Sequence, residues 1–390
     1  MIDFTFQNPA KIIFGKTALS SLRAEVLRYG KRVLLVYGGG SIKRFGLYDQ
    51  IMDILNGMDA QVWELSGIQP NPRLSRVYDG IALCREHSIE LVLAIGGGSA
   101  IDTAKAIANG ACYDGDVWEL YVGKGSNTSV LPLGTIVTIP AAGSEMSFSS
   151  VITRDADLCK LGRNSPFNVP KFSILNPEYT YTLPAFQTAC GCVDIMAHIM
   201  ERYFTQVEHV ELTDRMAEGA LQTVLHNAPI ALEQPNNYDA RAEIMWAGCL
   251  AHNTLFQTGR IGDWASHKLE HELSALYDIA HGAGLAIVFP AWMKFALAHG
   301  GEKKLAQFAA RVMGVSPDLG TDQAIAQEGI LRLEAFYHAL GLATTLHDIQ
   351  IDDRDFTRMA ERCVELMGGV VGAFIPLGVQ ECLEIYQLAL

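Results

Sequence analysis

The chain has 390 residues, enough for two domains, and its 49% hydrophobic and 19% charged content is typical of a globular protein. The 30 Lys and Arg against 43 Asp and Glu give a net charge of −13, which argues against nucleic acid or an anionic membrane as the main partner. We find no signal peptide, no apolar run near the ~20 residues of a membrane helix and no CxxC pair, so we expect a cytoplasmic protein with reduced thiols.

Strands and helices are expected to alternate through the first 183 residues. Short apolar runs predict strands, and longer amphipathic stretches between them predict helices. The segment 113–131 carries glycines and is expected to be a loop. This alternation predicts an α/β domain with a doubly wound, mostly parallel sheet. The expected strands are 4–6, 11–15, 32–37, 61–65, 91–95, 134–140 and 172–175, and the expected helices are 19–29, 47–55, 74–87 and 100–108.

Two of the expected strands end in three consecutive glycines. Gly38, Gly39 and Gly40 precede Ser41, and Gly96, Gly97 and Gly98 precede Ser99 and an expected helix. Glycine lets the backbone approach a phosphate closely, and the first N–H groups of a helix point at it. Because the spacing is not GxGxxG, each run alone fits a ligand-free turn equally well. Two such runs at the carboxyl ends of parallel strands favour dinucleotide binding.

Helical periodicity dominates after residue 183, so we predict a dinucleotide-binding domain at 1–183 and an all-helical, metal-binding domain at 184–390. Asp194 and His198 are four residues apart, which places them on one face of a helix. His267 and His271 repeat this spacing, and His281 follows an expected helix end. Either pair alone is more often a surface contact, but the apolar neighbours of Asp194 indicate burial. One carboxylate and several imidazoles, with no thiolate, suit Fe(II) or Zn(II). We therefore predict a metal site of Asp194, His198, His267 and His281.

Together these motifs resemble the iron-containing alcohol dehydrogenases, in the branch of butanol dehydrogenases and NADPH-dependent aldehyde reductases, over essentially the whole chain. The resemblance implies a dehydroquinate synthase-like architecture, the same four metal ligands, a homodimer and an active site in the cleft between the domains. The chain departs from the family at Ala141 and Ala142, where threonines are frequent, and at Asn176, where many members have Asp. The motifs are 38–41, 96–99 with Asp102 and Lys105, 143–146, Asp194/His198, and His267/His271/His281 with Gly282.

The implied reaction is hydride transfer between a nicotinamide cofactor and a small primary alcohol or aldehyde such as butanol or butanal, with the metal as a Lewis acid. His271 either shuttles the proton or only hydrogen-bonds beside the metal. No acid stands at Gly38, and Lys43 and Arg44 follow, which predicts NADP(H) in preference to NAD(H). The expected cofactor contacts are Gly38, Gly39, Gly40, Ser41, Lys43, Asn71, Gly97, Gly98, Ser99, Asp102, Thr138, Ser147 and Lys160.

Other functions fit parts of the pattern. A polyol or glycerol dehydrogenase, or a dehydroquinate synthase-like enzyme, would share the fold but need a more polar or cationic pocket. A helical metal hydrolase of the HD type would use clustered His and Asp but has no need for the glycine runs. A nucleotide-binding module without activity would have no need for the ligand set. The native metal and the preferred alcohol are left open by the sequence.

Overall fold

The computed structural model describes residues 1–390, and the chain forms two compact units. Unit 1 contains Met1–Phe6, Pro184–Gln234 and Thr254–Leu390, whereas unit 2 contains Gln7–Leu183 and Pro235–Asn253. The main change of unit falls after Leu183, but a single cut there does not describe the fold. The first six residues belong to unit 1, and the segment Pro235–Asn253 belongs to unit 2.

Unit 2 is built on a six-stranded parallel sheet with the order β1-β8-β5-β4-β2-β3. This sheet confirms the predicted doubly wound α/β class. The central strands are buried because helices cover both faces, which is why they read as unbroken apolar runs. The strands are β1 (Lys11–Phe14), β2 (Arg32–Tyr37), β3 (Gln61–Leu65), β4 (Leu91–Gly96), β5 (Leu133–Val137) and β8 (Phe172–Leu175).

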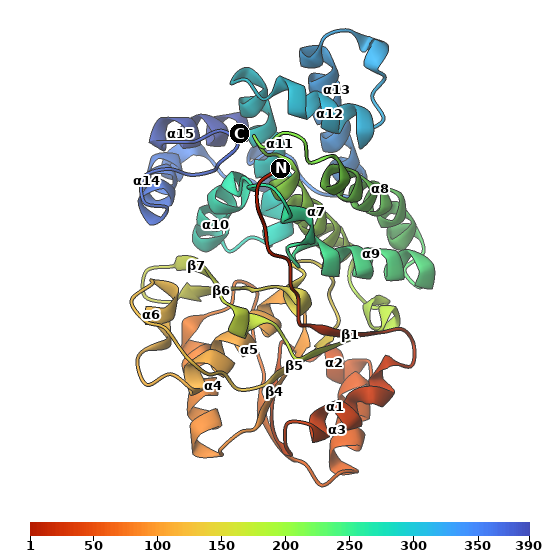
Figure 1. The fold of residues 1–390 in the computed structure, drawn as a ribbon, viewed down its shortest axis with the longest axis vertical. Coiled ribbons are helices and arrows are strands. Elements are labelled where there is room, and N and C mark those ends of the chain that lie inside the picture. Colours follow the sequence, from red (N-terminus) through yellow and green to blue (C-terminus); the bar gives the residue numbers. More distant parts are fainter. The chain divides into compact units, whose positions relative to one another are not determined.

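Helices lie on both faces of this sheet (Figure 1). On one face, α1 (Leu22–Leu27) and α3 (Leu47–Asn56) share a core with Leu35 of β2 and Leu93 of β4. On the other face, α4 (Leu74–Glu86) and α5 (Gly98–Ala111) pack against each other. The remaining helical elements of unit 2 are η1 (Ala18–Ser21), α2 (Ser41–Arg44), α6 (Val117–Tyr121), η2 (Ser144–Met146), η3 (Pro166–Asn168), η4 (Pro177–Thr180) and α9 (Tyr238–Ala251).

Two local predictions are wrong, and one hairpin was missed. Residues 4–6 form no strand, because their exposed backbone has no neighbouring strand with which to pair. The expected loop at 113–131 contains α6, whose N-cap Asp116 accepts a hydrogen bond from the Trp118 N–H. An antiparallel hairpin of β6 (Ser149–Arg154) and β7 (Cys159–Asn164) was not expected.

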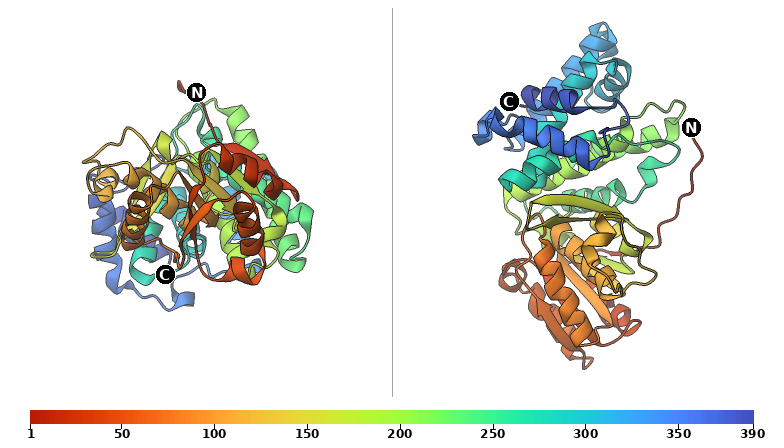
Figure 2. Two further views of the ribbon diagram at one scale, coloured as in Figure 1. Left: turned by 90° about the horizontal axis from the view of Figure 1, so that it is seen from below. Right: turned by 90° about the vertical axis from the view of Figure 1, so that its left-hand side faces the viewer.

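Unit 1 contains helices and no β-strand, as both views of Figure 2 show in the green to blue part of the chain. The central helix is α11 (His281–Ala298), which packs against α7, α10, α13 and α15. It is long and apolar enough to cross a membrane, but 78% of it is buried inside the structure, as is typical of a core helix. The other helices are α7 (Ala185–Tyr203), α8 (Glu211–Glu233), α10 (Ala265–Tyr277), α12 (Glu302–Arg311), α13 (Asp322–Ala339), α14 (Phe356–Leu366), α15 (Val379–Leu388), η5 (Leu255–Gln257), η6 (Pro317–Leu319), η7 (His347–Ile349) and η8 (Asp353–Asp355).

Candidate functional site

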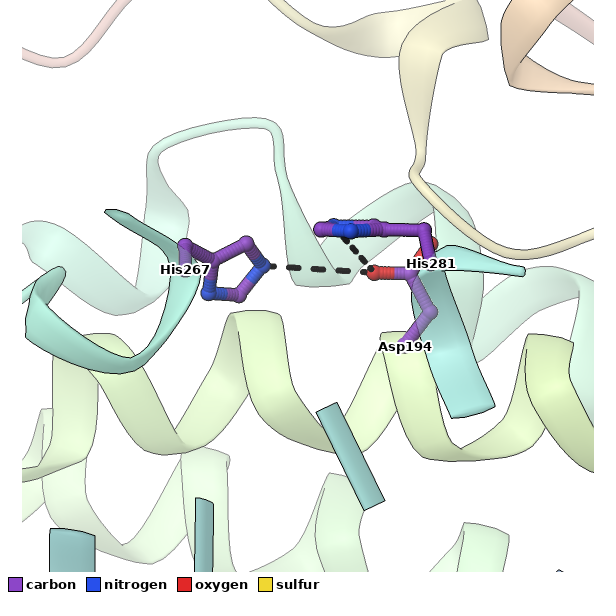
Figure 3. Close-up of side chains that lie close together, drawn as sticks. All are labelled: Asp194, His267 and His281. Atoms are coloured by element: carbon purple, nitrogen blue, oxygen red, sulfur yellow. Dashed lines mark ion pairs between the residues drawn. The ribbon is translucent and has the colours of Figure 1, made fainter. Parts of the chain in front are cut away.

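Three of the predicted metal ligands converge from three helices of unit 1 (Figure 3). Asp194 projects from α7, His267 from α10, and His281 is the first residue of α11. The Asp194 Oδ1 atom lies 4.0 Å from His267 Nε2 and 3.8 Å from His281 Nε2. One ligand atom from each of the three residues lies within 4.8 Å of the others. This spacing leaves room for one cation between them.

His198 and His271 border this group without belonging to it. His198 stands one turn along α7 from Asp194, and its ring centre is 4.5 Å from that of His267. His198 Nδ1 lies 2.9 Å from both the carbonyl oxygen and the Oδ1 atom of Asp194. His271 is buried, and its ring centre is 5.5 Å from that of His281. The fourth predicted ligand and the predicted proton carrier are therefore both beside the cluster.

The backbone brings these side chains together by ending one helix sharply and starting the next. Asp278 takes a left-handed conformation with φ 53° and ends α10, and α11 begins three residues later at His281. Gly282 lies against the backbone of Cys190 on α7, which holds the start of α11 close to the helix that carries Asp194.

Two buried charged side chains flank the cluster. Glu201 and Arg202 follow His198 on α7 by one turn, and both side chains are buried. Burial raises the pKa of Glu201 well above its usual value, and Asp263 adds to the rise, whereas N–H groups of His267 and Trp264 oppose it. Burial also lowers the pKa of Arg202 to about 9, partly opposed by Glu201. The Arg202 Nη1 donates to the His198 carbonyl oxygen at 2.6 Å.

The donor set fits a divalent metal ion of intermediate softness. It offers one carboxylate and several imidazoles, which is the ligand chemistry of Fe(II) and Zn(II) in proteins. Cys190 and Cys192 lie on the same helix as Asp194, and both side chains are buried. Burial raises the pKa of Cys190 to about 12, so that thiol stays protonated at neutral pH and is a poor metal ligand.

The two glycine runs of unit 2 differ in what the fold requires of them. A Cβ added at Gly39 would meet nothing within 4 Å, so open space lies over this turn. A Cβ added at Gly97 would lie 2.9 Å from the Cβ of Ile139, so this glycine allows the segment after β5 to pack closely. Helix α5 begins at Gly98, which places its first N–H groups at the end of β4 as a phosphate site requires.

Four of the predicted cofactor contacts, Asn71, Asp102, Ser147 and Lys160, are engaged within the protein. The Asp102 carboxylate accepts hydrogen bonds from Ser144 Oγ at 2.6 Å and from the Val151 N–H at 2.8 Å. Lys105 is buried and donates to the carbonyl oxygens of Ser147 and Ser149, while Ser147 Oγ accepts from the Ser149 N–H. Hydrogen bonds of Asp102 and Ser147 therefore stabilise the segment 144–151 next to α5. Lys160 Nζ donates to Asn71 Oδ1 at 2.9 Å, and both residues are buried.

Lys43, the cation predicted to meet a 2′-phosphate, has an acidic partner. Its Nζ lies 3.5 Å from Glu64 Oε2, next to the ring of Tyr48 at 4.3 Å. The hydroxyls of Tyr37 and Tyr48 also donate to Glu64. Burial alone would raise the pKa of Glu64, but the hydrogen bonds from these tyrosines and the nearby Lys43 lower it overall. Glu64 is therefore ionised at neutral pH, and it offsets the charge of Lys43.

Helix α9 holds the segment 141–146 in place. Cys249 Sγ donates to Glu145 Oε1 at 3.0 Å, and His252 Nδ1 lies 3.0 Å from the Ala142 carbonyl oxygen. Gly143 has φ 60°, and a Cβ there would lie 2.5 Å from the Gly248 carbonyl oxygen. The close approach of α9 thus requires glycine at this position.

Four residues of these sites were missed in the sequence: Glu201, Glu270, Glu64 and Cys249. Glu201 follows Asp194 by seven residues, and Glu270 follows His267 by three, so helical spacing would have placed both acids on the ligand-bearing faces. No comparable signal marks Glu64 or Cys249, because each acts on a residue distant in the sequence.

Comparisons with known proteins agree over the whole length of the chain. Residues 9–177 match the family model described as iron-containing alcohol dehydrogenase, and residues 188–390 match its C-terminal counterpart, Fe-containing alcohol dehydrogenase family, C-terminal. The chain is 47% identical to a probable NADH-dependent butanol dehydrogenase 2 of Bacillus subtilis strain 168, over 100% of both chains. It is 39% identical to the NADPH-dependent aldehyde reductase YqhD of Escherichia coli K12, over 94% of both.

The structure is also similar to solved ones. The crystal structure of an NADH-dependent butanol dehydrogenase A from Thermotoga maritima matches with a TM-score of 0.95 and 38% identity, covering 100% of this chain and 99% of that one.

Proposed function

The chain belongs to the iron-containing alcohol dehydrogenase family and is an oxidoreductase of alcohols and aldehydes, and we propose that it acts on small primary ones at a metal site in unit 1. A nicotinamide cofactor held by the glycine turns of unit 2 would exchange hydride with the substrate carbon. The family membership sets aside the metal hydrolase and the inactive binding module.

The observation that carries the proposed metal site is the convergence of Asp194, His267 and His281. These residues would hold the ion, with the adjacent His198 as the fourth ligand. The chemistry that such an ion supplies is Lewis-acid polarisation of an alcohol or carbonyl oxygen. Burial of Asp194 and His267 excludes water from two of these side chains, which strengthens their interaction with a cation.

We propose His271 as the proton carrier. Its imidazole is one helical turn from His267 and beside His281, and an unperturbed imidazole changes protonation near neutral pH. His271→Gln should then lower turnover and remove one limb of its pH profile. A variant that keeps the pH profile of the wild type would assign His271 to hydrogen bonding alone.

For the cofactor, we revise the predicted preference for NADP(H) and propose that NADH is used at least as well. Glu64 offsets Lys43, and a carboxylate near the adenine ribose disfavours a 2′-phosphate. The butanol dehydrogenases of Bacillus subtilis that are 45% and 47% identical to the chain are named NADH-dependent. The relative named NADPH-dependent is 39% identical. The ratio of kcat/KM with NADH to that with NADPH tests this, and a ratio well below one would restore the first prediction.

The central test is spectrophotometric. Protein reconstituted with Fe(II) or Zn(II) is mixed with butanal and either reduced cofactor, and the loss of the reduced nicotinamide absorbance is followed. We expect turnover that stops on chelation and returns with metal. Turnover in metal-free protein contradicts the metal site, and no turnover with any small aldehyde contradicts the proposed substrates. Glycerol and 1,3-propanediol, assayed in the oxidising direction beside butanol, test the polyol alternative.

We further propose that the enzyme is a cytoplasmic homodimer. The net charge of −13 supports the absence of nucleic acid and anionic membranes among its partners. Light scattering of the purified protein measures the oligomeric state, and a monomer would contradict it.

A further inference from the structure

Every histidine of the proposed metal site has its Nδ1 atom next to an oxygen. His198 Nδ1 lies 2.9 Å from the Asp194 carbonyl oxygen, and His267 Nδ1 lies 2.8 Å from Glu201 Oε1. His281 Nδ1 contacts Glu270 Oε2. Each of these oxygens is a carbonyl or carboxylate oxygen, and an oxygen that accepts a hydrogen bond from the ring leaves the proton on the Nδ1 atom that faces it. In a neutral imidazole the lone pair then lies on Nε2, the atom that binds a metal.

We propose that Glu201 and Glu270 are positioning residues, which orient His267 and His281 so that both Nε2 lone pairs face Asp194. This inference rests on the proposed metal site and deepens it. It predicts that the two acids set the affinity of the site for a divalent ion and the geometry around that ion. The Nε2 atoms already point the required way, since they lie 4.0 and 3.8 Å from Asp194 Oδ1.

Glu201 fixes both the helix and the ring of His267. Its Oε1 atom accepts from the His267 backbone N–H at 2.9 Å as well as from the ring, and its Oε2 accepts from the Trp264 N–H at 2.5 Å. Trp264 is the N-cap of α10, so the carboxylate from α7 serves the first turn of that helix. One oxygen that binds the backbone and the ring of the same residue leaves the ring little freedom to rotate.

Glu270 fixes the ring of His281 across a helix boundary. It lies on α10 and is fully buried, whereas His281 begins α11. The fold reserves space for this carboxylate, because a Cβ added at Gly284 would lie 2.6 Å from Glu270 Oε1. A side chain at 284 would therefore push the carboxylate away from the histidine that it orients.

The alternative is that both acids only stabilise the fold. Buried carboxylates that accept several N–H groups do so in many proteins, and removing one costs stability whatever its role. Metal affinity and the spectrum of a bound ion separate the two explanations, since a purely structural acid would leave both unchanged in the folded variant.

The test uses Co(II) as the probe, because its visible bands report coordination geometry. Glu270→Gln and Glu201→Gln are compared with Glu272→Gln, a control that removes a buried acid of α10 paired with Arg362 at 3.3 Å. Chelator competition measures affinity, and thermal unfolding of the metal-free proteins measures stability. We expect both test variants to bind Co(II) about 10–100-fold more weakly with altered bands. Glu272→Gln should keep the wild-type affinity and spectrum.

Gly284→Ala provides a second route that leaves both acids in the chain. It should weaken Co(II) binding in the same direction as Glu270→Gln, because it displaces the carboxylate. Folded variants at Glu270 and Gly284 that bind Co(II) with the wild-type affinity and spectrum would overturn the proposal. If the wild-type protein itself binds no metal, the proposed function fails instead, so the two failures are distinguishable.

Discussion

Gly282→Ala is the sharpest small perturbation of the metal site that the structure offers. An added Cβ would lie 2.0 Å from the carbonyl oxygen of Cys190 and 2.8 Å from its Cα, and real Cβ atoms essentially never approach closer than 3.0 Å. The obstacle is helix backbone, which cannot rotate aside as a side chain can. The start of α11 must therefore retreat from α7 by at least about 1 Å.

This retreat has two calculable effects. Overpacking a buried contact costs about 1–3 kcal/mol, against which alanine recovers up to about 1 kcal/mol of helix propensity. His281 is the residue before Gly282 and would move with the helix, away from Asp194. A displacement of about 1 Å at a reacting centre can lower a rate by about 100-fold. We expect metal affinity and turnover to fall more than stability does.

Gly219→Ala is the matched control. Gly219 is an exposed residue inside α8, and a Cβ there would meet nothing within 4 Å. This change should raise the free energy of unfolding by up to about 1 kcal/mol and leave the metal site alone. Denaturant unfolding, metal content and butanal reduction are measured for both variants. A Gly282→Ala protein as stable and as metal-loaded as Gly219→Ala would refute the close approach of α11 to α7.

Three further predictions concern single side chains. His267→Ala should abolish both metal content and turnover, and activity retained in metal-stripped protein would contradict this role. Glu64→Gln should raise kcat/KM with NADPH relative to NADH, whereas Tyr48→Phe, which keeps the carboxylate, should not; an unchanged ratio contradicts the specificity argument. Burial lowers the pKa of Lys105 to about 8 from 10.5, so the unfolded chain binds more protons between these pH values and stability should rise with pH there. Replacing Lys105 with Met should remove up to about 1.4 kcal/mol per pH unit of that slope in denaturant titrations, and an identical slope contradicts it.

The parts of the fold that the sequence predicts well are those where local pattern and burial agree. The strand 32–37 has the predicted bounds, because a parallel strand between two helical layers is a continuous apolar run with clear ends. Residues 149–164 mix polar and apolar side chains and received no prediction, yet β6 and β7 pair with each other there. Pairing of this kind depends on a partner strand that periodicity does not reveal.

In the candidate site, too, the residues with a local sequence pattern were predicted and their distant partners were not. Asp194 and His267 were predicted because they belong to pairs with helical spacing, and the donor chemistry of those pairs is specific. Helical spacing would have placed Glu201 on the face of Asp194, but it does not show that Glu201 contacts His267, which is 66 residues away. The cofactor preference predicted from Lys43 meets the same limit. Its charge is visible in the sequence, but the carboxylate of Glu64 that offsets it is visible only in the fold.

Helical periodicity in the sequence could not show that α9 belongs to unit 2. Residues 235–253 are helical like the segments around them, but periodicity says only that one face is buried, not what buries it. In the structure, Cys249 and His252 of this helix contact the segment 141–146 of unit 2. A chain cut at residue 183 would therefore leave the segment 141–146 without the helix that holds it. The helices of the proposed metal site and the helix that supports this segment thus lie in one continuous half of the sequence.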